Sequence, residues 1–426
     1  MTLFQAIGAI LTLVALFGYL NARFFRLPEP VGITAVGLAV SLVVAIAGLA
    51  IPAVARGAQL AVDQLNFSEV VFQGMLGLLL FAASLHIDWS DMAQEKWAIG
   101  ALASIGVLAS TALVGTAFYY VLQWTGFALP FLHCLLFGAL ISPTDPIAVM
   151  SMLRSVGLPK RVETRIAGES LFNDGTGVVV FLTLLGLATG GSETTITSAF
   201  ALLALQVVGG AAIGFAGGFV GFYMLRGIDS YAVEILITLA MATAGYALAE
   251  VLHGSAPIAV VIMGLVIGNH GRVLAMSERT RQRLFEFWEV VDEILNLVLF
   301  GLIGLNVIAL VPALSRIAPA LYAIPIVLIA RWISVGVPLL SMHRLLHASR
   351  NEISIMTWGG LRGGISVALA LSLSHIEGRN VIIAATYAVV LFSILVQALT
   401  LVPMVRWLES RQDKRKAAPR REPARG

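Results

Sequence analysis

The chain is divided into long apolar stretches, and this pattern limits what it can fold into more than any other feature. Each stretch is about 20 residues long, enough for a helix rising ~1.5 Å per residue to cross the ~30 Å hydrocarbon core of a bilayer. Only 12% of the 426 residues are charged, about half the share in a soluble domain. The sequence therefore predicts an all-α integral membrane protein.

We expect about thirteen transmembrane helices, connected by loops too short to hold a soluble domain. These helices are predicted at 3–22, 29–52, 69–86, 97–122, 130–152, 166–190, 196–225, 231–252, 256–269, 288–312, 317–342, 353–374 and 381–405. We assign residues 1–405 to the transmembrane domain. The remaining residues, 406–426, are predicted to form a short, basic, disordered cytoplasmic tail, with contact to anionic lipid as the alternative.

The basic residues predict the orientation of the chain in the membrane. With thirteen crossings, fourteen Lys and Arg residues fall in one set of alternate loops, and three (Arg56, Arg316 and Arg379) fall in the other. By the positive-inside rule, the richer set and the tail are cytoplasmic, and the N-terminus faces outward. The pI near 9.1 then reflects topology, and we expect a lipid bilayer rather than a nucleic acid as partner. Short loops indicate a prokaryotic plasma (inner) membrane.

Two of the predicted spans carry helix-breaking residues near their middle. In 130–152, Pro143 and Pro146 flank Asp145, and each proline removes a backbone donor and disfavours helix at the residue before it. In 353–374, four glycines surround Arg362 and weaken the helix. The proline pair alone is compatible with a simple kink. Broken helices at matching places in two halves, however, are typical of the substrate site of a secondary transporter.

Two carboxylates lie within these apolar stretches, Asp145 in the first broken span and Asp174 in the span that follows. Placing a charge at the bilayer centre costs at least ~2.5–3.5 kcal/mol, so such groups are expected to serve function. Ser170 lies four residues before Asp174 on the same helix face, and Thr144 precedes Asp145. These oxygens are ligands that suit small hard cations. Because an apolar wall strengthens proton binding by a carboxylate, Asp174 is expected to hold either a proton or a cation.

Other ionisable and amide groups have structural interpretations. Asp145 could instead cap amide groups freed by the two prolines. Glu169 is interpreted as a counter-charge for Arg331 or Arg362, because an unpaired buried charge is costly. Asn173 is interpreted as a hydrogen-bonding support for a neighbouring carboxylate. Five further groups are predicted to lie at the membrane interface: Glu250, His253, Glu289, Asp292 and Glu293.

Three motifs together resemble one transporter family. They are Ser-Pro-Thr-Asp-Pro at 142–146, Glu-Ser-Leu-Phe-Asn-Asp-Gly at 169–175 and Trp-Gly-Gly-Leu-Arg-Gly-Gly at 358–364. They resemble the hallmark motifs of the monovalent cation:proton antiporter-1 family, the NhaP/NHE-type sodium/proton exchangers. The resemblance spans the whole chain. It implies an inverted-repeat antiporter fold with two broken crossing helices, a core domain, a dimerisation domain, a homodimer and elevator-type alternating access.

The resemblance also implies a role for each motif residue. Asp174 would bind Na⁺ and H⁺ in alternation, and Asp145, Thr144 and Ser170 would complete the cation site. Asn173 stands where electrogenic relatives carry a second Asp, which implies electroneutral exchange of one proton per cation.

The remaining motif charges would support the site. Glu169 would pair with a buried arginine, for which we favour Arg331, while Arg362 would steady the second broken helix. One departure from the family pattern is Ala82, near which relatives often carry an acidic residue.

We therefore expect an antiporter that exchanges Na⁺ (or Li⁺ or K⁺) for H⁺, not an enzyme, with no cofactor besides the transported ions. A cation channel is disfavoured because the chain has one asymmetric polar cluster instead of repeated rings. An intramembrane aspartyl protease is disfavoured because Leu-Phe-Asn, not Gly-x-Gly, precedes Asp174. A symporter of organic acids is disfavoured because the site lacks aromatic or additional basic residues.

Overall fold

The protein is a bundle of helices joined by short connections. The computed structural model describes residues 2–51, 53–54, 56–57, 60, 67–154, 156–189, 196–307, 317–342, 348–373 and 376–417, and none of these residues forms a strand. Nine helices within this part of the chain are long and apolar enough to cross a membrane, and two apolar helices are shorter, Phe131–Leu140 and Ala256–Gly271. The prediction of an all-α membrane protein is confirmed, while the number thirteen stays a prediction.

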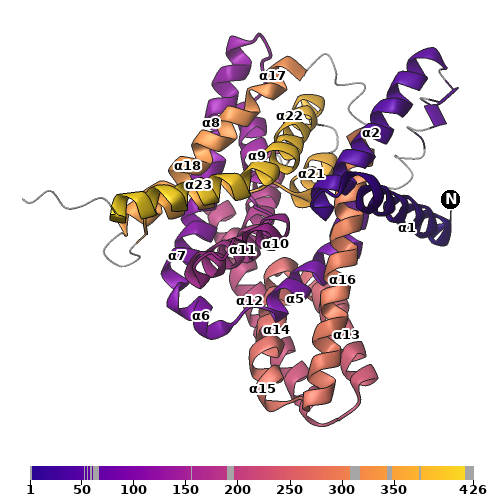
Figure 1. Ribbon diagram of the computed structural model, residues 1–426, viewed down its shortest axis with the longest axis vertical. Helices are drawn as coiled ribbons and strands as arrows, with labels where there is room; N and C mark the ends of the chain where they lie inside the picture. Colours follow the sequence, from indigo (N-terminus) through magenta and orange to yellow (C-terminus); the bar gives the residue numbers. More distant parts are fainter. Residues whose placement is uncertain are drawn as a thin grey trace, which may run out of the picture.

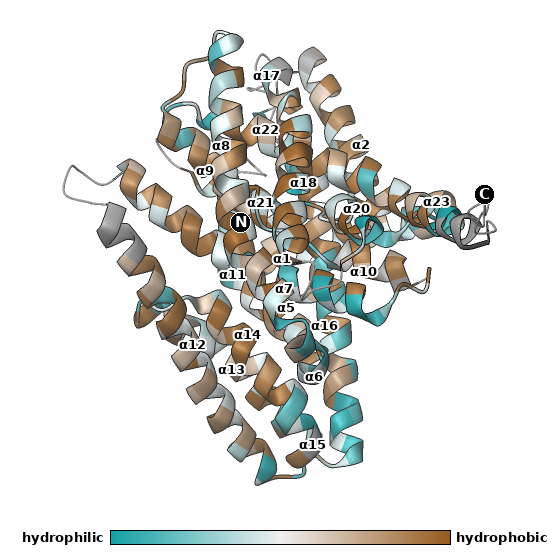
Figure 2. Ribbon diagram, turned by 90° about the vertical axis from the view of Figure 1, so that its left-hand side faces the viewer, coloured by the Kyte–Doolittle hydropathy of each residue, from teal (hydrophilic) through white to brown (hydrophobic). Residues whose placement is uncertain are grey.

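Two groups of helices lie at opposite ends of the long axis (Figures 1 and 2). One group contains α12 (Ile196–Arg226), α13 (Tyr231–Val251) and α14 (Ala256–Val266), and the other contains α8 (Val107–Trp124), α9 (Phe131–Leu140) and α22 (Arg379–Phe392). Helix α11 (Lys160–Thr189) connects them, because it packs against α9 as well as against α12 and α14. The motif carried by α11 is therefore placed between the two groups.

The first helices of the chain pack closely against a later one. Helices α1 (Leu3–Leu20) and α2 (Glu29–Ala50) both contact α16 (Glu278–Leu305). The hydroxyl of Thr34 on α2 donates to the carbonyl oxygen of Phe300 on α16 at 3.1 Å. A Cβ at Gly37 would lie 3.2 Å from Gly304 Cα. Small residues and hydroxyl groups thus let these helices approach each other, as is typical of helix packing in membranes.

Both predicted breaks are present. The first broken span consists of α9 and α10 (Ile147–Arg154), separated by a non-helical segment that contains Asp145. The second consists of α20 (Arg350–Trp358) and α21 (Gly364–Ser372), separated at residues 359–363. The breaks coincide with the prolines and glycines because these residues remove a donor or favour non-helical backbone.

Several helices extend beyond the apolar windows predicted from sequence. Helix α11 begins at Lys160 instead of 166, and α16 begins at Glu278 instead of 288. The apolar window marks only the part of a helix that matches the bilayer, whereas the helix continues as far as capping allows. At the start of α16, the Ser277 hydroxyl accepts a hydrogen bond from the Thr280 backbone N–H, an N-cap that fixes this end.

The predicted disordered tail requires a correction. Helix α23 (Ala398–Ala417) continues past residue 405, so residues 406–417 are helical. Extending an existing helix is much easier than starting one, because each added residue gains a backbone hydrogen bond. In addition, the Arg411 guanidinium lies 3.8 Å from the centre of the Trp407 ring. The rest of the tail, 418–426, lies outside the described residues.

A cluster of charges ties three helices together at the start of α11. The buried Arg165 side chain donates from Nε to Glu95 Oε2 at 2.6 Å, and Glu95 immediately precedes α7 (Lys96–Ala101). Arg165 Nη1 also lies 3.5 Å from Glu352 Oε2, and Arg161 Nη2 lies 3.4 Å from the same oxygen. Because Glu352 belongs to α20, this cluster joins α11 to the second broken span.

Gly138 provides a test of the close packing between α8 and α9. A Cβ at this position would overlap the carbonyl oxygen of Thr111, a backbone atom that cannot rotate away. We expect Gly138→Ala to lower the free energy of unfolding by about 1–3 kcal/mol. The measurement is thermal unfolding in detergent. The control is Gly8→Ala, because a Cβ at Gly8 would meet no atom within 4 Å. Equal melting temperatures for the two variants would contradict this packing argument.

Candidate functional site

The two broken spans cross each other, and each satisfies polar groups freed by the other. The backbone N–H of Asp145 donates to the carbonyl oxygen of Leu361 at 2.8 Å. In the opposite direction, Arg362 Nη1 donates to the carbonyl oxygens of Ser142 and Pro143, the latter at 3.0 Å. These two carbonyls follow the end of α9, where helical acceptors lack their usual partners. The crossing therefore replaces the backbone bonds that the prolines and glycines remove.

Glycine at position 363 allows this close approach. A Cβ there would overlap the side chain of Asp145, so a larger residue would displace that carboxylate. Gly363 is also the N-cap of α21, and Asp145 lies two residues before the start of α10. The Asp145 carboxylate thus lies near the N-terminal ends of two short helices. The partial positive charge of helix N-termini stabilises an anion in such a place.

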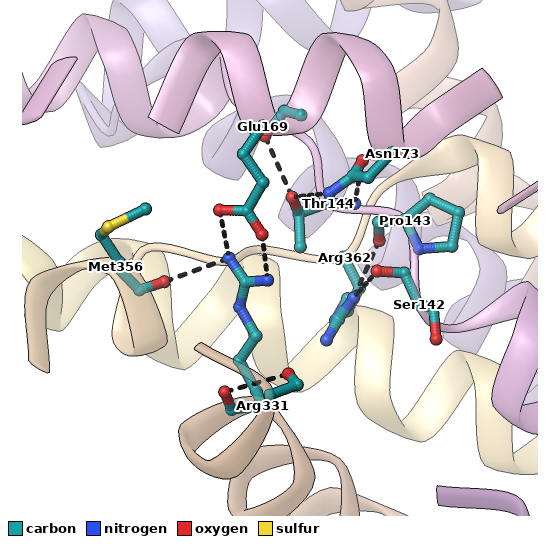
Figure 3. A network of polar contacts seen from close by, with 10 residues as sticks. Ser142, Pro143, Thr144, Glu169, Asn173, Arg331, Met356 and Arg362 are labelled. Atoms are coloured by element: carbon teal, nitrogen blue, oxygen red, sulfur yellow. Dashed lines mark hydrogen bonds and ion pairs between the residues drawn. The ribbon is translucent and has the colours of Figure 1, made fainter. Parts of the chain in front are cut away.

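Three side chains link the first break to α11 by hydrogen bonds (Figure 3). The Thr144 backbone N–H donates to Asn173 Oδ1 at 3.2 Å, and Asn173 Nδ2 donates back to Thr144 Oγ1 at 2.8 Å. The Thr144 and Ser170 hydroxyl oxygens are 3.0 Å apart. All three residues are buried. Asn173 therefore supports the extended segment at Thr144, whereas the sequence predicted that it would support a carboxylate.

A buried ion pair lies beside this cluster. Arg331, on α18 (Ala323–Ser341), contacts both carboxylate oxygens of Glu169, and its Nη2 is 3.0 Å from Oε2. Arg331 Nη2 also lies 3.4 Å from the Met356 carbonyl oxygen on α20 (Figure 3). Glu169 is therefore paired with Arg331, the partner favoured from the sequence, while Arg362 binds backbone carbonyls.

Asp174 and Asp145 line the same cavity. This cavity has a volume of about 550 Å³ and is also lined by Thr144. Asp174 is 7% exposed, and none of the ion pairs formed by the described residues involves it. Ser170 is not one of the lining residues, and its hydroxyl contacts that of Thr144, which is. A buried, unpaired carboxylate facing a cavity can bind either a proton or a cation.

One face of α11 leads from the opening of the cavity to Asp174. Glu163, Ala167, Leu171 and Asp174 all line it, and their spacing of three or four residues places them on one side of the helix. At the start of α11 the lining residue Lys160 is exposed, and Glu163 is half-buried. The cavity thus runs from the surface at the start of α11 to the buried carboxylate.

The opposite wall of the cavity comes from α5 (Leu76–Leu85) and α16. Asp88, at the N-cap of α6 (Trp89–Gln94), lies at the opening and is exposed. Its pKa is below the usual value because its carboxylate accepts hydrogen bonds from the side chain and the backbone of Ser90. Asp88 therefore stays ionised at neutral pH and contributes negative potential at the opening.

The structure adds residues that the sequence interpretation placed elsewhere. Glu289, Asp292 and Glu293, which were predicted to lie at the membrane interface, all line this cavity, together with Asn296. Their depth in the membrane stays a prediction, while the cavity identifies the helix face on which they lie, which the boundary of an apolar window does not give. The recurrence of acidic and amide residues every three or four positions along an apolar helix is the signal that was available. Ala82, the position at which the sequence departs from the family pattern, is fully buried.

The Glu169–Arg331 pair leads to a prediction about stability. Glu169→Gln leaves the buried Arg331 charge without its partner, so we expect the free energy of unfolding to fall by about 3–5 kcal/mol. Adding Arg331→Met should recover much of this loss, because no unpaired charge then remains. Thermal unfolding in detergent measures both variants. The control is Glu278→Gln, which removes one member of an exposed pair with Arg281; it should change stability by less than about 1 kcal/mol.

Comparisons with known proteins agree with this architecture. A family model described as "Sodium/hydrogen exchanger, transmembrane" matches residues 11–407. The Na⁺/H⁺ antiporter NhaP of Pseudomonas aeruginosa is 46% identical over 416 residues, which cover 96% of this chain and 98% of that protein. The Na⁺/H⁺ antiporter NhaH of Halobacillus dabanensis is 33% identical, over 91% of this chain and 93% of that protein.

A solved structure shares the fold. The sodium proton antiporter MjNhaP1 from Methanocaldococcus jannaschii superimposes with a TM-score of 0.74, covering 95% of this chain and 99% of that one, at 20% sequence identity. The matched relatives are named as transporters and not as enzymes. The extent of the family match and the identity to NhaP show that this chain belongs to the sodium/hydrogen exchanger family.

Proposed function

We propose that the protein is a secondary-active antiporter that exchanges Na⁺ for H⁺ at Asp174. The observation that carries this proposal is the shared cavity, in which two carboxylates, Asp174 and Asp145, meet at the crossing of two broken helices. The family match and the names of NhaP and NhaH support the same exchange. The protein is a multi-pass membrane protein, and we place it in the bacterial plasma membrane with its N-terminus outside.

The exchange follows from competition at one carboxylate. When Na⁺ binds, the Asp174 carboxyl group releases its proton to the cavity; when a proton returns, the cation loses its ligand and leaves. The competition requires a carboxylate that is buried yet reached by the cavity, as Asp174 is. The cation would be held by Asp174, Asp145 and an oxygen of Thr144, and Ser170 would contribute through its hydroxyl contact with Thr144. Oxygen ligands of this kind suit hard monovalent cations better than soft metals.

We further propose that the exchange is electroneutral, with one proton per cation. Position 173 is occupied by an amide, which has no proton to release at neutral pH. Both ends of this amide are engaged with Thr144, at 3.2 and 2.8 Å. Asn173 thus acts as a positioning group for the first break, and Asp174 is the proton carrier beside it.

The cavity also supports an inward-facing state. Three of its exposed lining residues, Asp88, Lys160 and Glu289, lie near loops that the positive-inside rule assigns to the cytoplasm. One wall belongs to α11 and the two breaks, and the other wall belongs to α5 and α16. We propose that the first wall moves past the second as an elevator-type core within a homodimer, which exposes Asp174 to the other side.

The proposed exchange predicts proton movement that depends on an added cation. In proteoliposomes containing a trapped pH dye, adding Na⁺ should move protons in the opposite direction. Asp174→Asn should reduce this movement to the background of empty vesicles, because an amide cannot carry the proton. Li⁺ and K⁺ added in separate runs identify the preferred ion. Unchanged proton movement in Asp174→Asn would exclude Asp174 as the shared carrier.

Electroneutral exchange predicts insensitivity to membrane potential. Moving one net charge across the membrane is worth ~2.3 kcal/mol per 100 mV, so coupling that transfers a net charge responds strongly to an imposed potential. We expect the initial rate of proton movement in the wild-type chain to be the same, within error, at zero and at 100 mV imposed with K⁺ and valinomycin. A rate that follows the imposed potential would show that net charge is transferred.

A further inference from the structure

A second group of polar residues lines the cavity, two of them on α16 and one on α21. Asp292 and Asn296 lie one helical turn apart on α16, and both line the cavity. Ser366, on α21, lines the same cavity. We call these three residues the α16 site. The mechanism proposed above uses none of them.

The side-chain amide of Asn296 uses its nitrogen to bind its own helix, which leaves the side-chain oxygen on the other side of the amide. Its Nδ2 donates to the Asp292 carbonyl oxygen at 2.7 Å and to Asp292 Oδ1 at 3.1 Å. Reversing the amide would place its oxygen against these two acceptors, so the assignment is well determined. Asn296 is 3% exposed, and its Oδ1 has no hydrogen-bond partner among the described residues. Buried amide oxygens normally have a partner, so this one calls for an explanation.

The Ser366 hydroxyl is also buried without a hydrogen-bond partner among the described residues. The residue is 1% exposed, and its Oγ has no hydrogen-bond partner within the described part of the chain. A helical serine often donates to the carbonyl four residues earlier. For Ser366 that residue is Arg362, which lies in the break before α21. The break at residues 359–363 therefore also leaves the Ser366 hydroxyl without this usual hydrogen bond.

The two helices that carry these oxygens are in contact. Helix α16 packs against α21, and a Cβ at Gly364 would overlap the side chain of Leu299. Leu299 follows Asn296 by three residues and therefore lies on the same face of α16. The close contact between α16 and α21 therefore lies next to Asn296 and Ser366. Both residues line the cavity beside this contact.

The chemistry of this group matches a small cation. It offers one carboxylate and two neutral oxygens, all hard ligands, in a cavity whose opening carries further acidic groups, Asp88, Glu289 and Glu293. We propose that Asp292, Asn296 and Ser366 form a second cation site, which the transported ion occupies between the opening and Asp174. This inference rests on the proposed antiport, and it adds a cation site where α16 meets α21, apart from the shared carboxylate.

A station of this kind raises the local concentration of cation without taking part in proton exchange. Its loss should therefore change the apparent affinity for Na⁺ and leave the maximum rate nearly intact. We expect Asp292→Asn to raise the Na⁺ concentration at half-maximal rate about tenfold, because one close carboxylate charge is lost. Asn296→Leu and Ser366→Ala should raise it in the same direction, each by a smaller factor. Maximum rates should stay within about twofold of wild type.

The matched control is Glu293→Gln. Glu293 is exposed on the same helix and lines the same cavity, so this variant removes an equal charge without removing a ligand. We expect it to change the half-saturating Na⁺ concentration by about twofold or less, because an exposed charge is screened by salt. Equal effects of Asp292→Asn and Glu293→Gln would show a general electrostatic influence and overturn the α16 site.

A binding measurement separates the two sites directly. In purified full-length Asp174→Asn, NaCl should still raise the melting temperature relative to choline chloride at equal ionic strength, since a ligand that binds only the folded state stabilises it. Adding Asp292→Asn should abolish this difference. No Na⁺-specific stabilisation in Asp174→Asn, or one that survives Asp292→Asn, would overturn the α16 site. Absence of cation-coupled proton movement in wild type would instead refute the antiport itself.

Discussion

The interaction on which the rest of the structure depends is the mutual satisfaction of two broken helices inside the membrane. Backbone groups freed in hydrocarbon have no water to bind, so a break persists only where protein or a water-filled cavity supplies partners. Here each break supplies partners for the other: the Asp145 N–H donates to Leu361, and Arg362 binds the carbonyls of Ser142 and Pro143. This crossing places Asp145 next to the cavity that also reaches Asp174 on the neighbouring helix.

The two buried arginines near the crossing are both bound by groups other than Asp174. Arg331 is neutralised by Glu169, and Arg362 is bound by backbone carbonyls. Neither arginine forms an ion pair with Asp174 among the described residues. An arginine beside Asp174 would favour the ionised carboxylate and compete with a cation. Binding the arginines elsewhere therefore leaves Asp174 without an arginine partner among the described residues, as the proposed exchange requires.

The cavity joins two walls that would move relative to each other in alternating access. The α11 wall carries Asp174, while the α16 wall carries Asp292 and Asn296. A carboxylate on each wall allows a cation to be held first by one and then by the other. The unpartnered oxygens of Asn296 and Ser366 fit this arrangement, since the described residues offer them no hydrogen bond. The proposed α16 site thus extends the ion path from the opening to the crossing.

The sequence by itself determined the features that depend on local chemistry. Apolar windows predicted a helical membrane protein, Pro143, Pro146 and the glycines around Arg362 predicted both breaks, and spacing placed Ser170 and Asp174 on one face of α11. Only the tertiary structure decided which distant groups meet. It showed that Asn173 binds Thr144, that Arg362 binds backbone carbonyls, and that Asp292 lines the same cavity as Asp174. Periodicity defines a helix face, but the neighbour of that face is chosen by packing between segments far apart in the chain.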